Sequence, residues 1–142
     1  VTGDGAARGN PAVRGNGGAR ADPVVRLASI VEYFVKLQIE HRREVALYFR
    51  EAKSLPPEEA RAIDQSKLRF HRMLCALLND GKAAGLFDFD DTSLAASALG
   101  GMASWAFTWF QPEGRWVADS VAQQLAALAL KTVGASKQLP RP

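Results

Sequence analysis

The chain of 142 residues has one cysteine, Cys75, and only two histidines. A single cysteine excludes an intrachain disulfide and is typical of a reducing compartment such as the cytoplasm. No stretch of the chain approaches the roughly 18 uninterrupted apolar residues that a membrane span needs. The formal net charge of +3 is too weak to indicate nucleic-acid binding by itself. We therefore expect neither a membrane protein nor a strongly cationic one.

The chain also lacks a recognisable arrangement of catalytic or metal-binding residues. No Ser/His/Asp or Cys/His constellation and no glycine-rich phosphate loop is present, so we expect neither an enzyme nor a bound cofactor. His71 and Cys75 are spaced to share a helix face, but the only other histidine is His41. Because a metal site needs more ligands than two, a buried thiol beside a hydrogen-bonded histidine is the favoured interpretation.

Large apolar residues are almost absent from segment 1–21, which is rich in glycine and arginine. Such a segment cannot offset its ordering entropy, so we expect it to be flexible. An RGG-like nucleic-acid tail is the alternative interpretation. A plain flexible extension is favoured because no aromatic residues alternate with the arginines. The tail, 135–142, is expected to fray.

Between these ends, apolar residues recur at helical spacing over 22–134, which predicts one all-α domain of five to six helices. Asp22-Pro23 is a typical helix start, and Pro57 suits the first turn of a later helix. Glycines and prolines then mark the helix ends. The expected helices span 22 to about 40, 45 to 53, 57 to 84, 92 to 110, and 117 to 133.

The third helix, 57 to 84, carries apolar residues on two sides, which predicts a position in the middle of the domain. The fourth helix, 92 to 110, is apolar almost all round and contains two of the three tryptophans, Trp105 and Trp109. Segment 111–116 should form a turn, with Gly114 supplying any positive φ and Trp116 folding back on the helix ends.

The last two helices have more apolar surface than a small domain can easily cover. Small residues beside aromatic ones predict that a second copy of the chain covers the excess in a four-helix interface. The alternative is that both helices complete the core of a monomer. The residues expected at the dimer interface are Leu99, Ala103, Trp109, Val121, Leu125 and Leu128.

Aromatic and apolar residues from four helices could converge on a ligand pocket, because pockets are mostly apolar with a few polar groups. The alternative is that these residues are plain core. The expected lining consists of Phe34, Leu37, Phe49, Phe70, Leu74, Met102, Trp105 and Phe107. The candidate polar groups are Tyr33, Gln38, Tyr48, Arg69 and His71.

Three stretches of the sequence together form a recognisable pattern. The strongest is LGGMASWAFTWFQPEGRW followed by VADSVAQQLAALALKTVG, which contains Trp105, Trp109, Phe110, Pro112 and Gly114. The others are DPVVRLASIVEYFVKLQIEHRREVALYFREAKSLPPEEARAI and LNDGKAAGLFDFDD. These are packing and corner residues, and in their order and spacing they resemble the C-terminal domain of TetR-family transcriptional regulators.

The resemblance implies a bacterial transcriptional repressor that forms a homodimer through its last two helices and encloses an effector in the preceding ones. It implies a small apolar effector, and relatives of this branch often sense acyl-CoA or lipid-like molecules. Operator DNA would be bound only through a helix-turn-helix domain that is not seen in this chain. The alternative is a headless module that sequesters a ligand or pairs with a full-length relative, without binding DNA itself.

Overall fold

The computed structural model describes residues 21–135, and every regular element in that part of the chain is helical, as the sequence predicts. The expectations for the Gly/Arg-rich segment and for the C-terminal tail concern residues that lie almost entirely outside this range. The elements are α1 (Pro23–Glu40), α2 (Arg42–Glu51), the short 3-10 helix η1 (Ala52–Ser54), α3 (Pro57–Ala83), α4 (Thr92–Ser104), α5 (Ala106–Trp109) and α6 (Ala118–Thr132).

Two aspartates cap helices, and the first of them, Asp22, is the helix start that the sequence predicts. The Asp22 carboxylate accepts a hydrogen bond from the backbone N–H of Val24 at 2.8 Å, and Pro23 occupies the first turn of α1. The Asp91 carboxylate accepts one from the N–H of Leu94 at 2.7 Å at the start of α4. Each cap satisfies a backbone donor that the first helical turn leaves without a partner.

Glycines in the left-handed region end two helices. Gly85, with φ of 73°, follows α3, and Gly134, with φ of 74°, follows α6. Glycine tolerates this conformation because it has no Cβ. Gly114 was expected to supply any positive φ that the turn over 111–116 needs, but the φ of Gly114 is not positive. Gly114 instead closes the turn by donating its N–H to the carbonyl of Gln111 at 2.9 Å.

The helix expected over 92–110 is divided at Trp105 into α4 and α5. The Trp105 carbonyl accepts the backbone N–H of Thr108 at 3.0 Å and also its hydroxyl at 2.7 Å. A threonine side chain that bonds to a nearby carbonyl competes with the regular helical ladder. The prediction of a single helix over 92–110 was therefore wrong, because the helix is interrupted once. The short α5 ends with Phe110 as its C-cap, before Pro112.

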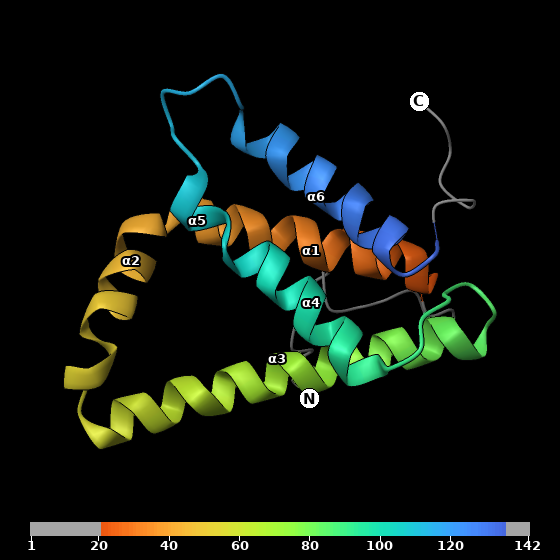
Figure 1. The fold of residues 1–142 in the computed structure, drawn as a ribbon, viewed down its shortest axis with the longest axis horizontal. Helices are drawn as coiled ribbons and strands as arrows, with labels where there is room; N and C mark the ends of the chain where they lie inside the picture. Colours follow the sequence, from red (N-terminus) through yellow and green to blue (C-terminus); the bar gives the residue numbers. More distant parts are fainter. Residues whose placement is uncertain (1–20, 136–142) are drawn as a thin grey trace, which may run out of the picture.

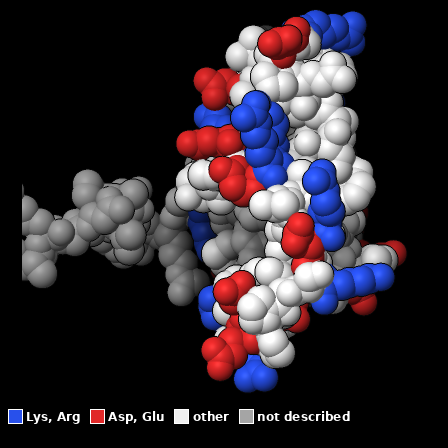
Figure 2. Space-filling view, turned by 90° about the vertical axis from the view of Figure 1, so that its left-hand side faces the viewer, with Lys and Arg blue, Asp and Glu red and all other residues white. Residues whose placement is uncertain are grey.

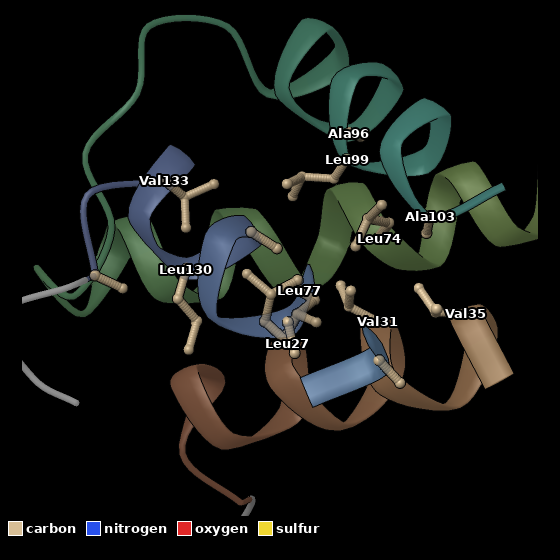
Figure 3. Packing of buried hydrophobic residues seen from close by; sticks show 14 of the residues in the cluster. Leu27, Val31, Val35, Leu74, Leu77, Ala96, Leu99, Ala103, Leu130 and Val133 are labelled. Atoms are coloured by element: carbon tan, nitrogen blue, oxygen red, sulfur yellow. The ribbon is translucent and has the colours of Figure 1, made fainter. Parts of the chain in front are cut away.

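α1, not α3, is the central helix of the domain. It packs against α6 along its length and against α3, α4 and α5 (Figure 1). Side chains from α1, α3, α4 and α6 converge in the core, where Leu27 and Val31 meet Leu77 and Leu130 (Figure 3). The prediction that α3 lies in the middle was wrong.

Only the C-terminal part of α3 is buried. Its buried residues are Leu74, Leu77, Leu78 and Gly81, whereas Leu68 is exposed. The N-terminal half of α3 extends beyond the core and is joined to α1 through α2, so that α1, α2 and α3 form three sides of a triangle that α4 crosses (Figure 1). No residue of α2, and none in the N-terminal half of α3, is buried in the main core.

Polar contacts join the elements at the other end of the domain, where α1 begins. Arg26 of α1 forms an ion pair with Asp80 of α3 at 3.4 Å. The backbone N–H of Asp88 donates to the carbonyl of Val133 at 2.8 Å, which joins the connector before α4 to the end of α6. The start of α1 is thus tied to the last turns of α3, and the connector before α4 is tied to the end of α6. None of the described helices is long and apolar enough to cross a membrane.

Candidate functional site

Three aromatic rings from α2, α5 and the residue between α4 and α5 form one cluster. Phe49 stacks on Phe107 with a centroid separation of 5.3 Å and an interplanar angle of 12°. Trp105 meets both rings edge-on, at 6.3 Å from Phe49 and 5.7 Å from Phe107. We call these three residues the aromatic cluster. Such stacked and edge-to-face pairs have the geometry that aromatic rings prefer.

Two of the three rings of the aromatic cluster are exposed, while Phe107 is half-buried. Phe49 is 51% exposed and Trp105 is 56% exposed. Large aromatic side chains left open in this way offer contact area to a ligand or to another chain, because their burial there would release apolar surface from water. The cluster is therefore a candidate binding surface rather than part of the core.

The other residues expected to line a pocket fall into two groups. Phe34 of α1 stacks on Phe70 of α3 at 4.6 Å, and both are half-buried, as are Leu37 and Met102. Leu74, by contrast, is buried among the core residues of α3. The eight residues thus comprise the three of the aromatic cluster, a second aromatic pair, the half-buried Leu37 and Met102, and one core position. Their role as a ligand-binding set stays a prediction.

Two polar groups lie on the aromatic cluster, and sequence reasoning identified only one of them. Tyr48 packs edge-on against Phe49 at 5.4 Å. Lys67 of α3, which was not expected there, donates from Nζ to the Tyr48 hydroxyl at 3.2 Å. Its position between Ile63 and Phe70 on the apolar stripe of α3 is the signal in the sequence that could have identified it.

The remaining polar candidates lie elsewhere. Tyr33 is exposed and Gln38 is half-buried, while Arg69 donates to the Ser66 hydroxyl at 3.0 Å on the surface of α3. His71 Nε2 lies 3.5 Å from Cys75 Sγ and 3.2 Å from the Ser93 hydroxyl. The described residues contain no group of three or more His, Cys, Asp or Glu side chains placed to hold a metal ion.

Three residues that were expected at a dimer interface belong instead to the core of the single chain. Leu99, Ala103 and Val121 are buried by α4 and α6 packing on their own neighbours. They expose almost no surface in the single chain, and the interface as a whole stays a prediction. Periodicity locates an apolar stripe on a helix but does not say which neighbour covers it.

Other apolar residues of the last helices do remain uncovered. On α4, Leu94, Ala98 and Gly101 are exposed and follow one another at helical spacing, and Trp105 comes one turn later. A Cβ added at Gly101 would meet nothing within 4 Å, so the backbone is open to close approach there. On α6, Leu128 is 48% exposed, and Leu125 is half-buried.

The turn between α5 and α6 is an exposed aromatic corner. Trp116 folds back on Trp109, edge-on at 5.9 Å, and the Arg115 guanidinium lies 5.1 Å from the Trp116 ring centroid. With Gln111 and Gly114, these residues border a surface hollow of about 250 Å³. The corner is built from the expected residues, and both of its tryptophans, Trp109 and Trp116, lie outside the core.

Charges of both signs are interspersed over the face shown in Figure 2, so no single-sign patch dominates it. Lys36 of α1 joins α1 to α6, with Nζ at 3.2 Å from a Glu32 carboxylate oxygen and 3.5 Å from one of Asp119. The hydrogen bond with Glu32, together with the negative charge of Asp119, raises the pKa of Lys36 above its ordinary value.

Comparison with known proteins places the chain in a family. Residues 20–133 match the family described as the tetracyclin repressor-like C-terminal domain. Because the match spans most of the chain, the protein belongs to this family, and its described part is a TetR-family regulator's C-terminal domain. No curated protein matches the chain.

Two solved structures have the same fold. One is a transcriptional regulator of the TetR/AcrR family from Thermobifida fusca YX-ER1, with a TM-score of 0.71 and 25% identity over 79% of this chain and 59% of that one. The other is AibR in complex with isovaleryl coenzyme A and operator DNA, with a TM-score of 0.66 and 26% identity over 76% of this chain and 59% of AibR. The chain therefore spans about 59% of the length of each neighbour.

Proposed function

We propose that this domain binds a small apolar effector and forms a homodimer within a TetR-family transcriptional repressor. The observation that supports the effector site most directly is the aromatic cluster of Phe49, Trp105 and Phe107, which is drawn from separate helices and is open to solvent. A structural protein would gain nothing from leaving such side chains exposed, whereas a binding domain uses them to bury apolar ligand surface.

The effector would bind on the surface that the aromatic cluster and the half-buried Phe34–Phe70 pair present. Its apolar part would replace water on the exposed rings, which is the main favourable term in such binding. Since AibR is described in complex with isovaleryl coenzyme A, an acyl thioester is the first class of effector to test.

The mechanism would be a shift between two positions of α1. This helix has 18 residues and so extends about 27 Å, from its start at Asp22 to the region of Phe34 and beyond. An effector that binds one arrangement of α1 and α2 more tightly would favour it, and the shift would be transmitted to the start of α1. In a whole regulator, a preceding helix-turn-helix domain would then lose its spacing on adjacent half-sites and release operator DNA.

The homodimer would use the exposed faces of α4 and α6. Leu94, Ala98 and Gly101 on α4 and Leu128 on α6 present uncharged surface that the single chain does not cover. Small residues allow close approach of two backbones, and the leucines add apolar area at the contact. This proposal keeps Trp109, Leu125 and Leu128 from the expected set and omits the three residues buried in the subunit's own core.

Titration with isovaleryl-CoA, and with longer acyl-CoA thioesters, would test the effector site by calorimetry. Phe49→Ala should weaken binding about tenfold or more, because it removes a ring that contacts both Trp105 and Phe107. Leu47→Ala is the matched control, since Leu47 lies on the same helix with 52% exposure and forms no part of the aromatic cluster.

The control should bind like the wild type. If Leu47→Ala weakened binding as much as Phe49→Ala, the effector would not lie on the aromatic cluster. If no acyl-CoA thioester gave saturable binding, this class of effector would be excluded for the domain.

A further inference from the structure

Lys67 is an exposed charged residue whose position continues the apolar stripe of α3. Ile63, Phe70 and Leu74 lie on the same side of this helix, since spacings of three and four residues bring side chains onto one face. Leu74 is buried, while Ile63 and Phe70 are half-buried. A lysine within this stripe directs its ammonium group toward α2 rather than away from the domain, as its contact with Tyr48 shows.

The Lys67 ammonium group sits beside the aromatic cluster. Nζ lies 5.9 Å from the ring centroid of Phe49 and 5.1 Å from that of Tyr48. It donates a hydrogen bond to the Tyr48 hydroxyl at 3.2 Å. Because the Tyr48 oxygen is the acceptor in this bond, its own O–H stays available as a donor, and Lys67 retains two further N–H donors.

No carboxylate among the described residues forms an ion pair with Lys67. Lys36 and Arg26, in contrast, both have acidic partners at 3.5 Å or less. The Lys67–Tyr48 pair thus combines a positive charge with donors on two side chains, and nothing in the described part of the chain neutralises it. Donors of this kind are suited to an anionic acceptor.

We propose that the ligand of this site is an organic acid, with a carboxylate bound by Lys67 and Tyr48 and a flat apolar body against the aromatic cluster. This inference rests on the effector site proposed above and adds the charge of its ligand. The negative group would satisfy the free donors, and the rings of Phe49 and Trp105 would cover the body. As the body displaces water, the charge-assisted bonds strengthen, because the local dielectric constant falls.

The alternative is that Lys67 only covers the aromatic rings with its alkyl stem and serves no ligand. The two possibilities differ in whether binding depends on ligand charge. Calorimetric titration with 2-naphthoate and with its neutral isostere 2-naphthamide measures this dependence directly. We expect 2-naphthoate to bind about tenfold more tightly than the amide to the wild-type chain.

Lys67→Met should reduce this preference to less than about twofold, since methionine keeps the apolar stem and removes the charge. Tyr48→Phe should reduce it in part. Lys82→Met is the matched control, because Lys82 is on the same helix and lies 4.8 Å from the ring centroid of Phe89, at the opposite end of α3. It should leave the preference for the acid unchanged.

Equal binding of the acid and the amide to the wild type would overturn the proposal, as would a preference that survives Lys67→Met or is lost equally in Lys82→Met. Absence of binding by both compounds would overturn it as well. Phe49→Ala separates the two failures. If it weakens acyl-thioester binding while neither naphthyl compound binds, only the organic acid is overturned, and if it changes the binding of no compound, the effector site on the aromatic cluster is overturned as well.

Discussion

Gly81→Ala should destabilise the domain although it replaces a glycine inside a helix. Gly81 is buried in α3, and the Phe87 ring packs directly on its backbone. The three atoms nearest to an added Cβ all belong to that ring, and even its Cγ would lie at only 2.7 Å. Since Cγ is next to the root of the side chain, a rotation of the ring tip cannot relieve the overlap, and the whole connector before α4 must shift.

The expected magnitude follows from two opposing effects. Overpacking of a buried site costs about 2–3 kcal/mol, while replacing glycine by alanine in a helix favours folding by about 1 kcal/mol. The net loss in the free energy of unfolding should therefore be about 1–2 kcal/mol. Gly100→Ala is the matched control, because Gly100 is inside α4 and its added Cβ would meet nothing within 4 Å. The control should be up to about 1 kcal/mol more stable than the wild type.

Urea unfolding followed by circular dichroism measures both variants. All proteins must be compared at one concentration, because the proposed dimerisation would make apparent stability depend on it. A Gly81→Ala variant that is as stable as the wild type, or that gains stability as Gly100→Ala does, would refute the contact between Gly81 and Phe87 and with it the placement of the connector.

Two further predictions concern the interface and the tie between α1 and α6. Leu128→Glu should convert the proposed dimer to monomers in sedimentation velocity, because a carboxylate would be buried without a partner. Leu68→Glu is the control: Leu68, on α3, is 47% exposed against 48% for Leu128, and its substitution should leave the dimer intact. Dissociation by both variants or by neither would contradict the proposed face. The pKa of Lys36 is raised above 10.5 by its hydrogen bond to Glu32 and by Asp119, so its contribution to stability is complete below that pH and is lost as the pH rises through the folded-state pKa. The stability difference between the wild type and Lys36→Met should accordingly shrink in unfolding curves recorded above pH 10.5, and a constant difference would show that the charge does not matter.

The helix ends could be predicted from the sequence alone. The caps at Asp22 and Asp91 and the left-handed glycines Gly85 and Gly134 depend on backbone groups within a few residues of each side chain. Such local physics is the same whatever the rest of the chain does. For that reason the all-α class and most boundaries were predicted correctly, and the family could be named from the order of these elements.

The tertiary structure decided which neighbour covers each apolar stripe. Leu99 and Val121 have the same periodic signature as Leu128, yet the first two are buried in their own subunit and the third is exposed. The break at Trp105 is different, because it involves a local hydrogen bond of Thr108, three residues away, that the spacing of apolar residues does not reveal.

The candidate site likewise depends on residues that the sequence contains and on contacts that only the packing of helices creates. The sequence contains every aromatic residue of the cluster, but only the path of α2 between α1 and α3 brings Phe49 to Trp105 and Lys67 to Tyr48, which is 19 positions earlier in the chain. Helix ends are set by interactions between near neighbours, and the sequence by itself determines them. Contacts between distant residues arise only when whole helices pack, and the packing selects one arrangement from several that the apolar pattern permits.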